Sequence, residues 1–283
     1  MKNIVLLLPY ENHSNRLFQN MHAEAFCIEK NVSYFNPSFC DIAYLYDSPC
    51  DCNYPSNMNF IEKILCLVMK IGFVKKLYKK IFPKGFLGFY YFRNEILNAD
   101  DYIFRQFQKR NNIFVGGFNF RFPNFTQKHQ DLFIKKYSLK KEFYENNKFV
   151  ETFMEQRTNK IAVGIHIRRS DYKTYKNGIY YFQDETYQKY MNNFAKQFFC
   201  KFNKECLFLI CSNEKTSFSN SENILVSEES WFIDQYLLSN CHYIIGAMST
   251  FSRWASFIGK VKIFHITDDS GKISFDDFEY CVE

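Results

Sequence analysis

The chain has 283 residues, a hydrophobic fraction of 47%, a charged fraction of 23% and a formal net charge of +6. This length suggests one large domain or two small ones, and the near-average composition excludes an intrinsically disordered chain. With 10 Gly and 6 Pro, collagen-like and low-complexity classes are also excluded. No run in the sequence approaches the ~20 uncharged apolar residues of a membrane-spanning helix.

The 10 cysteines indicate buried, reduced thiols. None belongs to a CxxC pair, and Cys50 and Cys52 have no His or second Cys pair at zinc-ligand spacing. Cys206 and Cys211 flank an apolar run, as core residues do. The apolar start at residues 3–9 is too short for a signal peptide and predicts a buried strand. We therefore expect a cytoplasmic, reducing location.

Positive charge is concentrated in residues 60–92, which contain seven Lys and the single acid Glu62, leaving 29 basic and 29 acidic residues elsewhere. The pattern predicts a basic amphipathic insertion. Residues 60–84 fit a peripheral contact with the inner face of a membrane, with Lys toward anionic lipid and apolar side chains toward the acyl boundary. The alternative is a core helix whose lysines form its solvated face.

In chain order, the first half alternates strands and helices. Residues 3–9 predict a strand, 16–31 a helix and 32–35 a second strand, which is typical of an α/β unit. Later segments continue the pattern with one or two helices in 60–82, a strand in 113–120 and a helical span in 124–150. The apolar signal thins around 151–160, so the domains are predicted as 1–155 and 156–283.

The second half alternates more regularly. Strands are predicted at 160–167, 205–212, 223–226, 242–246 and 261–266. Helices are predicted at 184–199, 230–240 and 249–259, the last with Ser249 as N-cap and Gly259 as C-cap. This alternation predicts a second doubly wound domain.

The strand at 160–167 ends in charged residues. Alternation places Ala162, Gly164, His166 and Arg168 on one face, and Arg169, Ser170 and Asp171 follow. Ligands of open α/β sheets bind beyond the carboxyl ends of the strands, and a guanidinium there holds a phosphate through two parallel hydrogen bonds. The alternative is an ion-pair cluster of Arg168, Arg169 and Asp171 that caps the strand.

Three other places in the sequence are candidates for ligand contacts. Residues 248–252 (MSTFS) lie between a strand and a helix, where hydroxyls and helix N-terminal amides form an anion site; alternatively, Ser249 only caps the helix. Asp234, inside an apolar helix, would cap, pair with a lysine or face a ligand. Asn15, in the turn after the first strand, fits a helix cap.

Four segments resemble the inverting α-1,2-fucosyltransferases of glycosyltransferase family 11. HIRRSDY (166–172) is similar to the family's HxRRxDY motif, and residues 234–259 resemble its block ending in STFSWW. Residues 15–27 are similar to the family's GNQLFQ-type opening, and 115–137 to its GYWQ segment and following helix. All four occur in the family's order.

The resemblance implies a GT-B-type α/β fold, with two Rossmann-like doubly wound domains facing a cleft. It also implies metal-independent transfer of L-fucose from GDP-fucose to a terminal galactose through an α-1,2 linkage, in synthesis of a surface polysaccharide or oligosaccharide. The acceptor would be an oligosaccharide or a lipid-linked glycan. The donor contacts it implies are His166, Arg168, Arg169, Asp234, Ser249, Thr250, Ser252 and Asn15.

In the implied chemistry, Arg168 neutralises the departing GDP, and the general base stays open among Glu11, His13 and Asp171. Glu11 and His13 are the acceptor-side candidates. Departures from the family pattern fall mainly outside the phosphate-binding residues and leave the acceptor and the exact donor sugar open. They are His13 and Ser14 for glycines, Arg16 for Gln, Ser170 for Gly, Arg253 for the first Trp, and Ser212–Glu214 for an acidic SDD.

The sequence contains no DxD motif, so we expect no metal and no cofactor, with GDP-fucose as a substrate. Three alternatives are weighed against this function. They are transfer from another nucleotide sugar, a catalytically silent nucleotide- or glycan-binding protein, and a nucleic-acid binder using the Lys and aromatic run 70–92. The last is disfavoured because that run lacks an RNA-binding or zinc motif. A protein kinase is excluded because HIRRSD lacks the Asn expected after its Asp and no GxGxxG loop exists.

Overall fold

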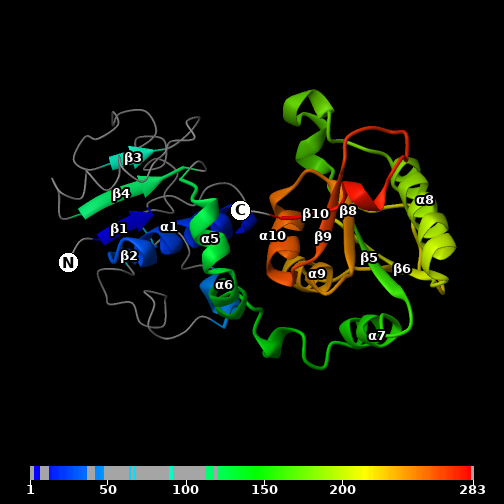
Figure 1. Cartoon of the computed structure of the whole chain (residues 1–283), viewed down its shortest axis with the longest axis horizontal. Coiled ribbons are helices and arrows are strands. Elements are labelled where there is room, and N and C mark those ends of the chain that lie inside the picture. The colour runs from blue at the N-terminus through cyan, green and yellow to red at the C-terminus, as the bar shows by residue number, and fades with distance from the viewer. Residues whose placement is uncertain are drawn as a thin grey trace. The chain divides into compact units, whose positions relative to one another are not determined.

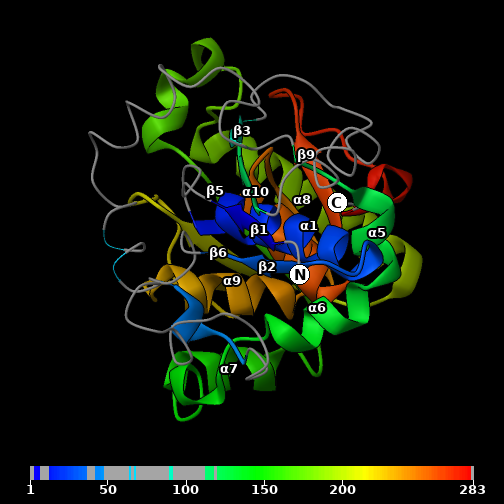
Figure 2. The same cartoon turned by 90° about the vertical axis from the view of Figure 1, so that its left-hand side faces the viewer.

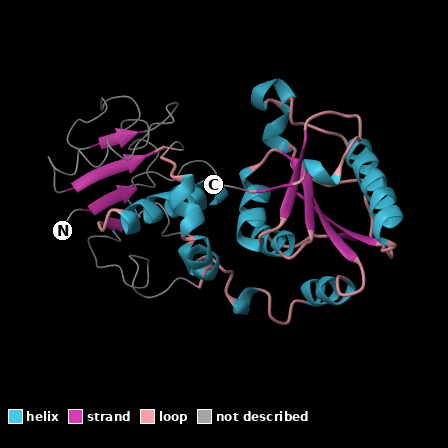
Figure 3. Ribbon diagram, viewed as in Figure 1, coloured by secondary structure: helices cyan, strands magenta, loops and turns pink. Residues whose placement is uncertain are grey.

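The computed structural model describes residues 3–6, 13–36, 42–47, 64, 67, 89–91, 112–117 and 120–281 (Figure 1). The chain divides into two compact units. The first is Met1–Ser138 with Val282–Glu283, and the second is Leu139–Cys281. Each unit contains one β-sheet with helices packed beside it (Figure 3).

The first unit has a four-stranded sheet in the order β2-β1-β4-β3, in which every pair of neighbours is parallel. Its strands are β1 (Asn3–Leu6), β2 (Ser33–Phe35), β3 (Phe89–Tyr91) and β4 (Asn112–Gly116). Strands β1 and β2 lie side by side (Figure 2) and are connected by helix α1 (His13–Glu29). This is the parallel α/β unit that the sequence predicted.

Helix α1 is buried from Leu17 to Cys27, including the polar residues of this stretch. Glu24 is 5% exposed, accepts a 2.7 Å hydrogen bond from the Tyr137 hydroxyl and pairs with the buried ammonium of Lys136. Lys136 belongs to α6 (Gln130–Lys136), which follows α5 (Pro123–Lys128). A buried carboxylate needs such partners, because desolvation penalises an unpaired charge strongly. The pair therefore fixes α1 against α6.

The second unit has a six-stranded sheet in the order β10-β9-β8-β5-β6-β7. All neighbours are parallel except the pair formed by β10 and β9. Read from β7, this is the 3-2-1-4-5-6 order of the nucleotide-binding Rossmann fold. The strands are β5 (Ile161–Ile167), β6 (Cys206–Ser212), β7 (Ile224–Val226), β8 (Tyr243–Ala247), β9 (Lys262–Ile266) and β10 (Glu279–Tyr280). The predicted α/β class with two Rossmann-like units is confirmed.

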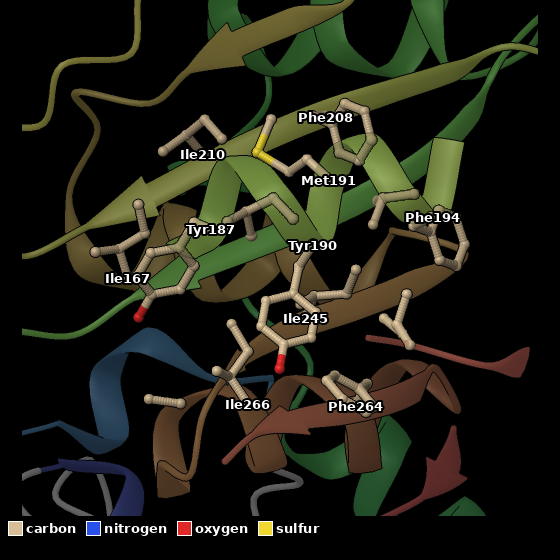
Figure 4. Packing of buried hydrophobic residues seen from close by; sticks show 14 of the residues in the cluster. Ile167, Tyr187, Tyr190, Met191, Phe194, Phe208, Ile210, Ile245, Phe264 and Ile266 are labelled. Atoms are coloured by element: carbon tan, nitrogen blue, oxygen red, sulfur yellow. The ribbon is translucent and has the colours of Figure 1, made fainter. Parts of the chain in front are cut away.

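One face of this sheet packs on helix α8 (Asp184–Phe202) (Figure 4). The strands contribute β-branched and aromatic side chains, among them Ile167 and Ile245. Helix α8 contributes Tyr187, Tyr190 and Phe194, each at most 1% exposed. Full burial of an aliphatic or aromatic side chain stabilises by roughly 1.5–3 kcal/mol, so this cluster supplies much of the stability of the second unit.

The opposite face carries small residues where helices α9 (Trp231–Ser239) and α10 (Thr250–Gly259) pack. A Cβ on Gly164 of β5 would lie 2.4 Å from Leu238 Cδ2. Val163, Ile165 and Ile167 belong to the cluster on the α8 face. The alternation predicted for this strand is therefore confirmed, and it directs His166 toward α9 and α10.

The cap prediction for α10 is half right. Ser249 is the N-cap, and its Oγ accepts a 3.2 Å hydrogen bond from Phe251 N. Gly259 is the last helical residue instead of the C-cap, and Lys260 takes the left-handed position at φ 52°. Gly259 has a different function, because a Cβ there would lie 2.0 Å from the Ser239 carbonyl oxygen. The glycine allows α10 to approach the end of α9.

Residues 139–156 belong to the second unit, so the structure divides the chain before the predicted boundary at 155/156. The contacts of this segment explain the difference. Tyr144 stacks on Tyr236 of α9 at 4.2 Å, and Asn147, the N-cap of α7 (Lys148–Gln156), donates to Glu229 at 2.9 Å. Because the partners of this segment lie further along the chain, at Glu229 and Tyr236, the pattern of residues 139–156 alone could not show which unit they join.

The predicted helices of 60–82 lie outside the described residues apart from Ile64 and Leu67, so the membrane contact of 60–84 stays a prediction. Within the described part of the chain, no helix combines the length and apolar character needed to cross a bilayer.

Candidate functional site

The strand order of the second unit reverses between β5 and β8. The chain leaves β5 toward β6 on one side, and it leaves β8 toward β9 on the other. Strands β5 and β8 are hydrogen-bonded neighbours, with His166 in register with Gly246. Open α/β sheets bind their ligands at the carboxyl ends of the strands at such a reversal. We refer to the carboxyl ends of β5 and β8 as the switch point.

A polar row crosses the sheet at this level. Cys211 of β6 pairs with His166 of β5, His166 with Gly246 of β8, and Gly246 with His265 of β9. Paired residues of neighbouring strands point to the same face. The row therefore places Cys211, His166 and His265 on the face covered by α9 and α10, with a glycine between the two histidines.

His166 is a buried, neutral imidazole. It is 5% exposed, and its ring stacks on Phe251 of α10 with centroids 4.8 Å apart. Burial lowers its pKa to about 3, helped by the positive charge of Arg168 and by His265. Burial, together with Arg253, likewise lowers the pKa of His265 to about 4. Both rings are uncharged at neutral pH and serve as hydrogen-bonding groups.

Each of these rings has a nitrogen available to a ligand. Nδ1 of His166 and Nδ1 of His265 are buried and have no hydrogen-bond partner among the described residues. Gly246, which lies between them, must lack a side chain because a Cβ there would lie 2.7 Å from the His166 carbonyl oxygen. Buried polar atoms are normally satisfied, so these two nitrogens point to a ligand or water.

Arg168 presents its guanidinium beside the switch point. The side chain is 18% exposed, and Nη2 lies 3.1 Å from the Asp171 carboxylate. The guanidinium carbon lies 5.3 Å from the centre of the Tyr172 ring, and Nε has no hydrogen-bond partner in the described part of the chain. Arg168 therefore keeps hydrogen-bonding capacity that is suited to an anion.

Arg169 has structural partners instead. Its side chain is 8% exposed, donates from Nε to the Phe182 carbonyl at 3.3 Å and pairs through Nη2 with Asp184, the first residue of α8. Burial raises the pKa of Asp184, but hydrogen bonds from Ser217 and Arg169 outweigh it and lower the pKa. The structure thus places the two adjacent arginines differently, with Arg168 by the switch point and Arg169 holding α8.

The N-terminus of α10 lies on the other side of the switch point. Thr250 is its half-buried first residue, and the first-turn amides of a helix attract anions. Ser249 caps the helix, and Ser252 is fully buried and donates to the Ser249 carbonyl at 3.2 Å. The hydroxyls of Ser249 and Ser252 therefore also maintain the loop that presents these amides.

Asp234 lies in the first turn of α9, next to the polar row. It is 8% exposed and accepts a 2.5 Å hydrogen bond from Ser227 Oγ, just beyond β7. Burial raises its pKa to about 7, opposed by hydrogen bonds from Ser227 and Cys211. Of the interpretations open from sequence, the structure excludes a cap or a surface lysine pair for Asp234, because Ser230 is the N-cap of α9 and Asp234 is buried with Ser227 and Cys211 as its hydrogen-bond partners.

The remaining predicted residues belong to the first unit. His13 is the first residue of α1, and Asn15 lies within its first turn, not at a cap position before the helix. Glu11 lies outside the described residues. The structure thus brings together His166, Arg168, Asp171, Asp234 and Ser249–Ser252 within the second unit.

Sequence reasoning missed three residues of the site. They are Tyr172, whose hydroxyl donates to the Met248 carbonyl at 2.6 Å, Gly246 and His265. The alternation in residues 261–266 places His265 opposite Phe264 and was the signal that could have found it. Within the described residues, no group of three or more His, Cys, Asp or Glu side chains is arranged to hold a metal ion.

Comparison with known proteins identifies the family of this chain. The sequence model of Glycosyl transferase family 11 matches residues 75–272. No curated protein matches the chain significantly in sequence. The chain belongs to glycosyl transferase family 11 and is a glycosyltransferase, as its motifs predicted.

Solved structures show the same fold. The α-1,6-fucosyltransferase NodZ of Bradyrhizobium, soaked with GDP-fucose, superposes with a TM-score of 0.53 at 13% identity, covering 94% of this chain and 95% of that one. A variant of Arabidopsis thaliana FUT1 in complex with GDP superposes with a TM-score of 0.56 at 12% identity, covering 98% of this chain and 73% of that one. The predicted GT-B-type fold class is confirmed by these matches.

Proposed function

We propose that this glycosyltransferase transfers L-fucose from GDP-fucose to a glycan, with inversion and without a metal ion. The observation that carries the proposal is Arg168, whose guanidinium lies beside the switch point with Nε unpartnered among the described residues. Family membership and the GDP and GDP-fucose complexes of the two fold relatives support a guanosine diphosphate donor.

The departure of GDP develops negative charge on the β-phosphate, which fixed cations or a metal must offset. Arg168 supplies a permanent positive charge, and the N-terminus of α10 supplies oriented amides. We infer that Arg168 is catalytic and that Thr250, with the Ser249 and Ser252 loop, holds the phosphate. Arg169 would contribute to diphosphate binding by fixing the loop after β5, through its ion pair with Asp184.

The guanosine end would lie along the polar row. In this proposal Asp234 is ionised when the nucleotide is bound, because its carboxylate then accepts hydrogen bonds from the N–H groups of guanine. Neutral His166 contributes Nδ1 from the same face of the sheet. Asn15 of the first unit is the further donor contact in this proposal.

The general base is proposed among Asp171, His13 and Glu11. Asp171 is exposed and pairs with Arg168, which brings a carboxylate near the reacting centre. For the acceptor we propose a terminal galactose, α-1,2-linked in the product, of a surface oligosaccharide or lipid-linked glycan. A cytoplasmic enzyme held at the inner membrane face through residues 60–84 fits that acceptor.

Thermal unfolding with added ligands tests the donor. We expect GDP-fucose and GDP to raise Tm, UDP-glucose to leave it unchanged, and EDTA to have no effect on any shift. A ligand at 100 times its Kd stabilises by ~2.7 kcal/mol. Arg168→Ala should abolish the shift and the transfer of fucose.

Arg157→Ala is the matched control. Arg157 also has a buried Nε without a partner in the described residues, but it neighbours His242 at the amino end of β8. The Arg157→Ala variant should show the same rise in Tm with GDP as the wild type. A shift with UDP-glucose alone would replace the fucosyl donor by another nucleotide sugar, and guanosine-ligand binding without turnover on any glycan would indicate a silent binder.

A further inference from the structure

Three tyrosines cluster between β5 and α8. The segment contains two short 3-10 helices, η6 (Ser170–Lys173) and η7 (Tyr175–Gly178). The rings of Tyr172 and Tyr175 stack with centroids 5.6 Å apart, and those of Tyr175 and Tyr180 stack at 6.2 Å. Tyr172 and Tyr180 are 6.1 Å apart. We call Tyr172, Tyr175 and Tyr180 the tyrosine cluster.

One side of the cluster is anchored and the other is open to solvent. Tyr172 is 8% exposed, and its hydroxyl donates to Met248, at the loop before α10. Tyr175 is 48% exposed. Its ring stacks on the anchored ring of Tyr172, so the cluster offers solvent an aromatic surface that a buried neighbour holds in place.

The backbone holds this surface in an uncommon conformation. Lys176, Asn177 and Gly178 have positive φ angles of 48°, 60° and 77° in succession. A left-handed conformation costs free energy for a residue with a Cβ. Lys176 Nζ lies 5.7 Å from the centre of the Tyr175 ring and 5.6 Å from that of the Tyr180 ring. An ammonium group, which donates hydrogen bonds, therefore lies beside the exposed ring.

The cluster is continuous with the switch point. Arg168 lies over the Tyr172 ring at 5.3 Å, and Tyr172 contacts Tyr175. A group held on Tyr175 is therefore linked through Tyr172 to the guanidinium that faces the leaving phosphate in the proposed function. The acceptor is the second substrate that must approach this centre.

Sugar rings fit this surface chemically. A pyranose has a face of C–H groups that packs on an aromatic ring, with hydroxyls around its edge that accept hydrogen bonds from an ammonium. Ligand sites combine an apolar surface with a few fixed polar groups in this way. We propose that the tyrosine cluster is the subsite that holds the acceptor sugar, with Tyr175 as its stacking platform and Lys176 as its donor. This proposal rests on the proposed function.

The test uses the full chain with GDP bound and a panel of immobilised oligosaccharides ending in β-galactose, including lactose and N-acetyllactosamine. The wild type should bind at least one of them. Tyr175→Ala should weaken that binding and raise the acceptor KM at least tenfold, whereas Tyr175→Phe, which keeps the ring, should stay within threefold of the wild type. The Tm shift with GDP should persist in both variants.

Tyr280→Ala is the control, since Tyr280 is 57% exposed and has Lys262 Nζ 5.6 Å from its ring. It should bind the glycan as the wild type does. Absence of glycan binding by the wild type, or equal binding by Tyr175→Ala, would overturn the subsite. A loss in Tyr175→Ala that is confined to GDP-fucose affinity would also overturn it, because the donor sugar would then lie on the Tyr175 ring.

Failure of the proposed function has a different signature. The chain would then bind the glycan through Tyr175, but neither GDP nor GDP-fucose would shift Tm.

Discussion

The two adjacent arginines after β5 carry the same charge in different surroundings. Arg169 is held by Asp184 and the Phe182 carbonyl, whereas Arg168 has one ion-pair partner at 3.1 Å and a nitrogen without a partner in the described residues. Breaking a buried ion pair is strongly destabilising, because it leaves a buried charge without a partner. We therefore expect Arg169 to fix the loop after β5, which leaves the Arg168 guanidinium beside the switch point for a ligand.

Asp234 gives a residue-scale prediction on pH. Its pKa in the folded chain is raised to about 7, chiefly by burial. Between pH 4 and 7 the folded state holds a proton that the unfolded state has lost, so stability should fall as pH rises through this window and level off above it. Each pKa unit corresponds to ~1.4 kcal/mol, so the loss amounts to at most ~4 kcal/mol.

Urea unfolding of the wild type and Asp234→Asn at pH 5, 6, 7 and 8 measures this effect. The asparagine still accepts a hydrogen bond from Ser227 and does not titrate. As pH rises, the free energy of unfolding of the wild type should therefore fall relative to that of the variant. A difference that is constant across this range would show that Asp234 is ionised throughout in the folded chain.

At the scale of elements, close contact between α9 and α10 depends on Gly259. A Cβ at this position would lie 2.0 Å from the Ser239 carbonyl oxygen, and backbone atoms cannot rotate away from it. Gly259→Ala should therefore destabilise the chain by ~1–3 kcal/mol, the usual cost of overpacking. The reduced Tm and urea midpoint would measure it.

Lys260→Gly separates this packing effect from a C-cap effect. Lys260 has the positive φ of 52°, so glycine there should stabilise by ~1 kcal/mol. If Gly259→Ala left the stability unchanged and Lys260→Gly lowered it, the contact between α9 and α10 would not be the reason for glycine at position 259.

The second unit also shows which features the sequence could predict and which it could not. Local rules predicted the strand alternation at 161–167 and the Ser249 cap, because both depend on neighbours in the chain. The role of Gly259 depends on Ser239, and that of Arg169 on Asp184, so both required the tertiary structure. For His265, alternation could indicate the face of the strand, but its pairing with Gly246 required the strand order.

At the scale of the whole molecule, charge is segregated along the chain. Residues 60–92 carry seven Lys and one acid, whereas the rest is balanced with 29 charges of each sign. Each lysine near an anionic membrane surface contributes ~1 kcal/mol of attraction. A membrane contact is therefore expected to depend on where the lysines lie and not on net charge.

Co-sedimentation with vesicles tests this dependence, with phosphatidylcholine alone or with 30% phosphatidylserine as two compositions of lipid. We expect binding to the anionic vesicles only, weakened by salt and lost when Lys75, Lys76, Lys79 and Lys80 are changed to Glu. The control changes four lysines that are exposed in the structure, Lys135, Lys141, Lys196 and Lys204. It alters net charge by the same amount and should retain binding. Equal loss in both variants would show that net charge alone drives adsorption to the vesicles. Retention in both variants would remove residues 60–84 from the membrane contact.

A third outcome would assign the basic segment to nucleic acid instead. The chain would then bind single-stranded RNA and not the vesicles, and only the first variant would lose RNA binding.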